Sequence, residues 1–187
     1  MVDVAVFASG NGSNFQNLVE YKSEIYRVKI LIVDRKNAYA IERGKKLGIE
    51  TVYVNIKKFE NKELYEKHIL EILEKKEIKF IILGGYMKII SPVLLNKFRN
   101  KIINIHPSYL PNFPGKSAIE DVYKKGEKET GVTIHFVDEG IDTGKIIYQE
   151  KIKINIKWTL EELENEIHRV EHRIYPKVIE KIVGGEI

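Results

Sequence analysis

Short apolar runs alternate with stretches of helical periodicity through the first half of the chain. Val2–Ala8 is almost wholly apolar and predicts a buried strand. Ser13–Tyr21 carries apolar residues at helical spacing and predicts an amphipathic helix. The two patterns then repeat, with strands expected at Val28–Val33, Thr51–Val54 and Lys79–Leu83 and helices at Ala38–Leu47 and Lys62–Lys75. Strands that alternate with helices at this spacing indicate parallel βαβ units.

The second half of the chain has a different pattern. Pro92–Phe98 predicts a short helix, and Lys101–Ile105 predicts a strand that stops at His106-Pro107. Thr130–Val137 and Lys145–Ile154 are rich in β-forming residues and are separated by a short turn that contains glycine. We therefore expect these two runs to pair as antiparallel strands.

A long helix is expected after these strands. Thr159 and Glu162 have the spacing of a capping box, and the helix that they open reaches about Val183, before two glycines. We expect Pro176 to kink or break this helix. These elements predict a single domain over residues 1–187 with a Rossmann-like α/β fold. In that fold a mostly parallel sheet is flanked by helices, with a late antiparallel strand pair and a long C-terminal helix.

Composition excludes several kinds of site. The 187 residues are 43% apolar and 31% charged, which is typical of a globular rather than a disordered protein. Cysteine is absent, so disulfides, thiolate metal sites and cysteine nucleophiles are excluded, and a reducing, cytoplasmic setting is expected. The N-terminal segment lacks the basic region of a signal peptide, and no apolar run reaches the roughly 18 residues of a membrane span.

Charge is spread along the chain rather than gathered in one place. The formal net charge is +4, and lysine alternates with glutamate over long stretches, as between Lys57 and Lys79. Such alternation is typical of a solvated helix face, and no basic cluster is interleaved with aromatic residues as in nucleic-acid-binding proteins. We therefore expect small anionic ligands as partners, and neither a nucleic acid nor a membrane.

A glycine-rich loop, Ser9-Gly10-Asn11-Gly12-Ser13-Asn14, joins the first strand to the first helix. A glycine turn at a helix N-terminus presents free backbone N–H groups and the positive end of the helix dipole, which suits a phosphate. Gly10 and Gly12 also match two glycines of a dinucleotide-binding fingerprint, although Phe15 occupies the third position. Asp34 lies where the ribose-binding acid of that fingerprint would be. A phosphate site is favoured, with a dinucleotide site and a plain structural turn as alternatives.

A second candidate, Asn104-Ile105-His106-Pro107-Ser108, lies at the end of the fifth expected strand. Residues two apart on a strand point to the same face, so Asn104 and His106 should project together while Ile105 turns into the core. Pro107 keeps His106 extended and ends the strand. Open α/β sheets bind their ligands at the carboxyl ends of parallel strands, so this polar pair is a candidate for catalysis or binding.

The third candidate is the acidic loop from Asp138 to Gly144. Gly140 and Gly144 permit unusual backbone angles around Asp142, so this acid can fold back toward a site. Taken alone, the segment is more typical of an ordinary hairpin turn.

Together, these segments resemble the phosphoribosylglycinamide formyltransferase family, the folate-dependent enzymes of purine synthesis. Asn-x-His-Pro-Ser with a later aspartate marks the wider formyltransferase superfamily, and the Gly-Asn-Gly-Ser-Asn loop narrows the match to the enzymes acting on glycinamide ribonucleotide. The matching stretches cover nearly the whole chain: Ser9–Asn14, Gly85–Ile90, Asn104–Pro111, Phe113–Gly115, Gly131–Phe136, Asp142–Gly144 and Glu171-His172.

The resemblance implies roles for individual residues. Asn104, His106 and Asp142 match the catalytic triad. The residues implied to bind the ribonucleotide are Gly10, Asn11, Gly12, Ser13, Asn14, Pro107 and Glu171. Those implied to contact folate are Lys62, Met87, Lys88, Ile89, Ile90, Asp138, Glu139, Gly140 and Ile141. The implied reaction transfers a formyl group from 10-formyltetrahydrofolate, a co-substrate, to the amine of glycinamide ribonucleotide. We expect no tightly bound cofactor, no metal, and a monomer or homodimer.

Several positions depart from the family pattern or from a simple functional interpretation. Lys62 stands where relatives carry an arginine near the folate, and Ser117 stands where some relatives carry a histidine that supports the triad aspartate. Proton handling is therefore expected to differ here, through Ser117 or water. Asp34 is unusual for the family, and nothing in the sequence explains it. The remaining histidines are interpreted as structural, exposed or lining residues: His135 inside a strand, and His68, His168 and His172 on helices.

Two other functions remain as alternatives. A related hydrolase of 10-formyltetrahydrofolate uses the same Asn, His and Asp but has a different phosphate loop. A non-catalytic phosphate- or nucleotide-binding module would use the glycine loop alone, and would leave Asn104, His106 and Asp142 without a role.

Overall fold

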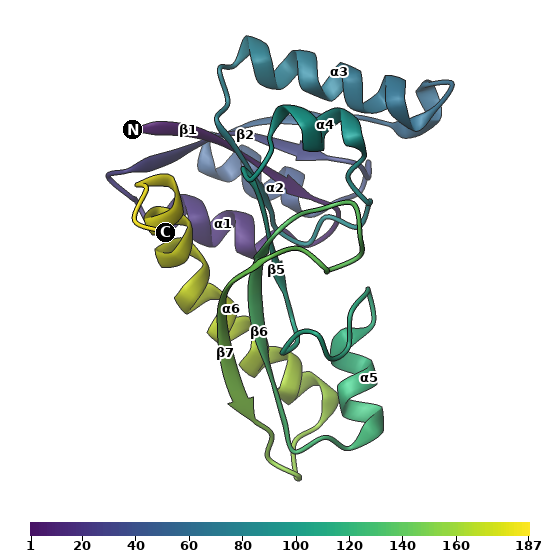
Figure 1. The fold of residues 1–187 in the computed structure, drawn as a ribbon, viewed down its shortest axis with the longest axis vertical. Helices are drawn as coiled ribbons and strands as arrows, with labels where there is room; N and C mark the ends of the chain where they lie inside the picture. The colour runs from purple at the N-terminus through teal and green to yellow at the C-terminus, as the bar shows by residue number, and fades with distance from the viewer.

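A seven-stranded sheet with helices on both faces forms the framework of the protein in the computed structural model, which describes all 187 residues (Figure 1). Its strands are β1 (Val2–Ala8), β2 (Tyr26–Val33), β3 (Glu50–Tyr53), β4 (Phe80–Leu83), β5 (Ile102–His106), β6 (Glu129–Phe136) and β7 (Ile146–Lys153). Its helices are α1 (Ser13–Glu20), α2 (Ala40–Leu47), α3 (Lys62–Lys75), α4 (Pro92–Lys97), α5 (Ala118–Lys125) and α6 (Leu160–Val183), with a 3₁₀ turn at Ile56–Lys58.

The strand order is β3-β2-β1-β4-β5-β6-β7. Strands β1 to β5 are parallel, whereas β6 is antiparallel to both of its neighbours. The predicted fold class is therefore confirmed. The chain leaves β1 toward β2 and β3 and then returns to place β4 on the other side of β1. Open α/β sheets bind ligands at such a reversal, outside the carboxyl ends of the strands.

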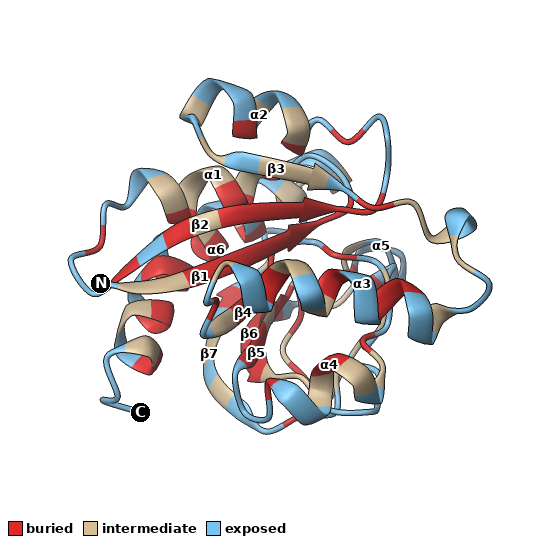
Figure 2. Cartoon of the chain, turned by 90° about the horizontal axis from the view of Figure 1, so that it is seen from above, coloured by how far each residue is buried: buried red, intermediate tan, exposed pale blue.

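The central strands are buried on both faces, as Figure 2 shows for β1 and β2. Along β1, Val4 and Val6 pack in one apolar cluster, whereas Ala5 and Phe7 pack in the other. Helices α1, α2, α5 and α6 contribute to the first cluster, and α3 and α4 contribute to the second. This two-sided burial explains why the strands are continuous apolar runs rather than alternating ones.

Helix α6 does not break at Pro176, which corrects that part of the prediction for this helix. The capping box of Thr159 and Glu162 is formed, and the helix continues for 24 residues. Proline has no N–H, so the carbonyl of His172 loses its usual helical donor. The side chain of Asn17 in α1 takes that place, with its Nδ2 donating to the His172 oxygen at 2.7 Å. A residue distant in sequence therefore satisfies the group that Pro176 leaves free.

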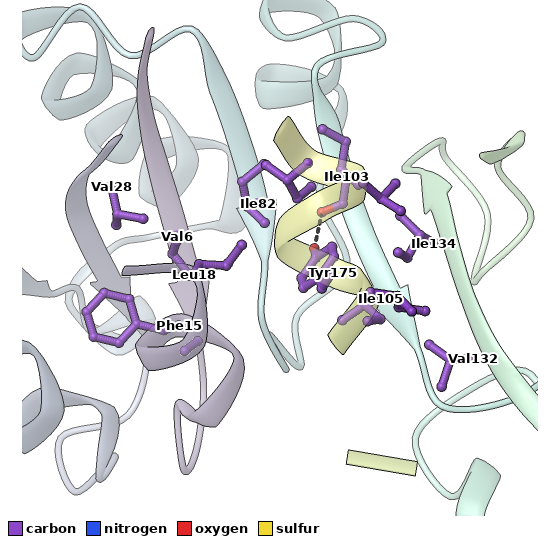
Figure 3. Packing of buried hydrophobic residues seen from close by; sticks show 14 of the residues in the cluster. Val6, Phe15, Leu18, Val28, Ile82, Ile103, Ile105, Val132, Ile134 and Tyr175 are labelled. Carbon is purple, nitrogen blue, oxygen red and sulfur yellow. Dashed lines mark hydrogen bonds between the residues drawn. The ribbon is translucent and has the colours of Figure 1, made fainter. Parts of the chain in front are cut away.

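Tyr175 links helix α6 to strands β4 and β5 of the sheet. Its hydroxyl donates to the carbonyl oxygens of Leu83 (2.8 Å) and Ile103 (3.2 Å), and the second bond is visible in Figure 3. The side chain is fully buried among the apolar residues of the first cluster. Helix α6 is thus held against the strands by a hydrogen bond as well as by apolar packing.

Helix α5 was not predicted. Ala118 and Val122, four residues apart, are buried on one face, so the local pattern does carry the helical spacing of this element. None of the helices combines the length and the apolar character that a membrane crossing requires.

Candidate active site

A cleft of about 1340 Å³ opens at the carboxyl ends of β1, β4 and β5. All three candidate segments line it: the glycine loop, the end of β5 and the acidic loop. Among the residues implied to be catalytic or to bind a substrate, Glu139 alone does not line the cleft; it is exposed beside Asp138 and Gly140, which do. No group of three or more histidine, aspartate or glutamate side chains is arranged to hold a metal ion.

The end of β5 presents two polar side chains to the cleft. Asn104 and His106 both line it and both contact Asp142, whereas the Ile105 side chain packs in the apolar core. His106 Nδ1 lies 3.3 Å from Asp142 Oδ2, and His106 Nε2 lies 2.8 Å from the carbonyl oxygen of Phe113. Both ring nitrogens face oxygen acceptors, and only the protonated imidazole carries a hydrogen on each nitrogen. Each ring nitrogen of His106 therefore has one oxygen partner.

Asp142 is the centre of the polar network. Its backbone is left-handed (φ 55°), which turns the carboxylate back into the cleft. Oδ2 accepts a hydrogen bond from the Gly115 N–H at 2.8 Å, and Oδ1 lies 3.5 Å from Asn104 Nδ2. Burial acts to raise the pKa of the carboxyl, but the contacts with His135, Gly115 and His106 together outweigh burial and hold that pKa below its usual range. Asp142 is therefore a carboxylate at neutral pH.

His135 belongs to this network, although the sequence interpretation made it only a structural residue. Its Nε2 lies 3.2 Å from Asn104 Nδ2 and 3.6 Å from Asp142 Oδ1, while its Nδ1 lies 2.8 Å from the Phe136 carbonyl oxygen. His135 and Asn104 are direct partners across the antiparallel β5–β6 ladder. This register depends on long-range pairing, which single-strand periodicity does not reveal.

Of the two routes expected for proton handling, Ser117 or water, the first has no direct contact with the aspartate. Ser117 precedes α5 and makes no side-chain contact with Asp142. The Gly115 N–H and His135 surround the carboxylate instead.

The glycine loop forms another end of the cleft and is held by α2. Gly12 has φ +74°, and a Cβ at this position would lie 2.6 Å from the Ala40 Cβ, so only glycine fits without a shift. Helix α1 starts at the next residue without a side-chain cap, which leaves first-turn N–H groups available to a ligand. Arg43 donates to the carbonyl and the side-chain oxygens of Asn11, both at 2.8 Å.

Glu171 connects the glycine loop to α6. The buried carboxylate lies 3.1 Å from Asn14 Nδ2 and 2.9 Å from His168 Nδ1. The hydrogen bond with Glu171 raises the pKa of His168, whereas burial lowers the pKa of the neighbouring His172. Both histidines line the cleft. This end of the cleft therefore combines backbone donors, a carboxylate and a histidine that favours its protonated form.

The segment from Gly85 to Ile90 lines the cleft beside the start of the glycine loop. The Ser9 N–H donates to the Gly85 carbonyl at 3.1 Å, and the Met87 N–H donates to Ser9 Oγ at 2.8 Å. Met87 and Ile89 expose apolar side chains, and Ile141 does the same across the cleft. Lys62, at the start of α3, and Lys88 also line this part. An apolar mouth with cations suits a flat organic ligand that carries carboxylates.

Comparisons with known proteins agree with this geometry. The sequence profile of the family described as formyl transferase matches residues 2–179. The phosphoribosylglycinamide formyltransferase of Bacillus subtilis (strain 168) is 44% identical, over 98% of this chain and 96% of that one. The crystal structure of glycinamide ribonucleotide transformylase 1 from Geobacillus kaustophilus has a TM-score of 0.94 at 44% identity, covering 98% of this chain and 99% of that one.

A longer relative is matched in part. The trifunctional purine biosynthetic protein adenosine-3 of Bos taurus is 35% identical over 98% of this chain, which spans 18% of that protein. The resemblance drawn from the motifs is confirmed by these matches. The chain belongs to the formyl transferase family, as an enzyme related over nearly its whole length to the phosphoribosylglycinamide formyltransferases.

Proposed function

We propose that this enzyme transfers the formyl group of 10-formyltetrahydrofolate to the amine of glycinamide ribonucleotide in purine synthesis. One observation carries the proposal: Asn104, His106 and Asp142 meet in a cleft that the glycine loop and the Gly85–Ile90 segment also line. The names of the full-length relatives support the ribonucleotide as acceptor.

Each substrate has a part of the cleft that suits its chemistry. The ribonucleotide phosphate binds the free N–H groups at the start of α1, with Glu171 near the glycinamide and ribose. The folate binds at the apolar mouth, where Lys62 supplies a cation for its carboxylates and Lys88, paired with Asp34, lines the wall. Holding the amine and the formyl carbon side by side removes much of the entropy cost of a two-substrate reaction.

The chemical step is a direct attack of the amine on the formyl carbon. A C–N bond forms, and the formyl oxygen becomes an oxyanion on a tetrahedral centre. Asn104 Nδ2 supplies a neutral donor to that oxygen. The protonated His106 supplies a charged donor from Nε2, which exchanges the Phe113 carbonyl for the oxyanion. Asp142 favours the charged imidazole because it places a carboxylate 3.3 Å from Nδ1.

Proton transfer completes the reaction. The attacking nitrogen must lose a proton, and the folate nitrogen must gain one as its bond to the formyl carbon breaks. His106 and Asp142, with an ordered water, form the path for this transfer. No covalent intermediate with the enzyme is needed, since both bonds change at the same carbon.

The test is an incubation of purified protein with 10-formyltetrahydrofolate, with and without glycinamide ribonucleotide. We expect tetrahydrofolate and the formylated ribonucleotide to form in equal amounts, and only when both substrates are present. Release of tetrahydrofolate without the ribonucleotide would instead make the protein a hydrolase. Binding of the ribonucleotide with no turnover would mean that the protein is a binding module without catalytic activity. Asp3→Asn, at the opposite end of β1, is the matched control and should retain full activity.

A further inference from the structure

Asp34 is a buried carboxylate at the end of β2 that the proposed reaction does not use. Its side chain is 2% exposed. Oδ2 lies 3.2 Å from Lys88 Nζ, while Oδ1 is buried without any hydrogen-bond partner. Removing a carboxylate from water is unfavourable unless its partners compensate, so a half-satisfied buried aspartate requires a reason.

The ion pair joins two segments that are not neighbours in the sheet. Asp34 follows β2, Lys88 follows β4, and β1 lies between these strands. The pair therefore spans the carboxyl end of β1, where the glycine loop starts. A dinucleotide site would need this acid free for a ribose, and here it is occupied by Lys88.

The Asp34–Lys88 pair is also the one polar contact that anchors residues 88–90 of the Gly85–Ile90 segment. The Met87 N–H is bound by Ser9, and the Ser91 N–H is bound by Glu66 at 2.9 Å. Between these two anchors, no backbone N–H or carbonyl of the segment has a hydrogen-bond partner. Ile89, in the same stretch, is 51% exposed at the mouth of the cleft.

We propose that Asp34 is a positioning residue for folate binding: by holding Lys88, it fixes the Gly85–Ile90 segment as one side of the folate site. Asp34 itself does not line the cleft, so it acts through Lys88 rather than on the substrate. The inference rests on the proposed function, since it takes this side of the cleft as the folate site.

A double-mutant cycle tests whether Asp34 acts through Lys88. The variants are Asp34→Asn, Lys88→Met and the two combined, with Asp3→Asn as the control for loss of an acid that pairs with cations elsewhere on the sheet. The Kd values of 10-formyltetrahydrofolate and of glycinamide ribonucleotide are measured separately by calorimetry. Asp34→Asn keeps the shape of the side chain and removes its charge.

We expect Asp34→Asn to raise the Kd of the folate roughly tenfold and to leave the Kd of the ribonucleotide within about twofold of wild type. In the Lys88→Met background, the same change should have no further effect on folate binding. Asp3→Asn should change neither Kd.

Three results would overturn the proposal. An unchanged folate Kd in Asp34→Asn would mean that the pair positions nothing, and a lowered Kd would mean that Asp34 competes with folate for Lys88. An effect of equal size in the presence and absence of Lys88 would make Asp34 a general structural residue. Failure of the proposed function is seen in a different experiment, the incubation of the wild-type protein with both substrates, where no formylated ribonucleotide would then form.

Discussion

The glycine loop and the network around Asp142 form parts of one cleft but are built in different ways. The loop, Gly10–Asn14, is continuous in sequence and offers mainly backbone N–H groups at the start of α1. The network draws its side chains from β5, β6 and a later loop, and each side chain is held by the others. Backbone donors keep their place when side chains change, whereas an interlocked network does not. Changes in the network should therefore reduce kcat, and changes in the loop should weaken ribonucleotide binding.

The strongest test of this contrast is His106→Ala. The variant loses a charged donor to the oxyanion and a step of the proton path, so we expect kcat to fall by about 10³-fold. The Kd of the ribonucleotide should stay close to that of wild type, because the glycine loop is untouched. His68→Ala, which alters a histidine of α3 outside the cleft, is the control. Parallel losses of kcat and of ribonucleotide affinity would contradict the separation of the two regions.

Asp142→Asn should have a smaller effect, about 10²-fold on kcat. Asparagine keeps the shape and tolerates the left-handed backbone, but it removes the charge beside His106. The protonated imidazole is then harder to form, so the part of the kcat–pH profile that reports it should move to lower pH.

The dependence of kcat on pH in the wild-type protein is the reference for the Asp142→Asn variant. The pKa of Asp142 is held below its usual range, so its contribution is present at neutral pH and is lost only as the pH falls through that lowered pKa. Full activity and an unchanged profile in Asp142→Asn would assign Asp142 to an ordinary turn.

Gly12→Val tests the other side of the comparison, because it changes the glycine loop and leaves the network around Asp142 intact. The added side chain meets Ala40 and blocks close approach of a phosphate, so the KM for the ribonucleotide should rise at least about tenfold. The KM for folate should change little. Gly48→Val is a close control, because Gly48 has a similar φ of +67° with open space around it. Equal effects on both substrates would indicate a folding defect instead.

The smallest expected effect belongs to Arg43, which holds the loop from α2. Arg43→Met removes two hydrogen bonds to Asn11, and the KM for the ribonucleotide should rise about fivefold. Arg43→Lys should behave like Arg43→Met, since lysine cannot reproduce the two-pronged contact. Lys46→Met removes a charge from the same helix and should have no effect. Full recovery in Arg43→Lys would show that charge alone matters.

Features that depend on local sequence could be predicted, and features that depend on distant partners could not. Apolar runs, the glycine turn and the alternation at Asn104–His106 each reflect a few neighbouring residues, and the structure contains all of them. The place of His135 depends on the register between β5 and β6. The continuity of α6 at Pro176 depends on Asn17, which is remote in sequence.

Other differences have equally specific causes. Glu139 lies in a segment whose neighbours face the cleft, and nothing in the local pattern indicates that its own side chain does not. Asp34 gains its partner, Lys88, only when β4 returns beside β1. For His135, Pro176 and Asp34, the missing information is a contact between elements rather than a property of one element.

The bonds of Tyr175 to Leu83 and Ile103 limit how this protein can change over evolution. Tyr175 lies one helical turn after Glu171, so the acid that contacts Asn14 of the glycine loop has a fixed position relative to β4 and β5. A single residue inserted between them would rotate Glu171 by about 100° around the helix axis. Many substitutions on the outer face of α6 are therefore tolerable in descendants of this enzyme, but insertions and deletions in this turn are not.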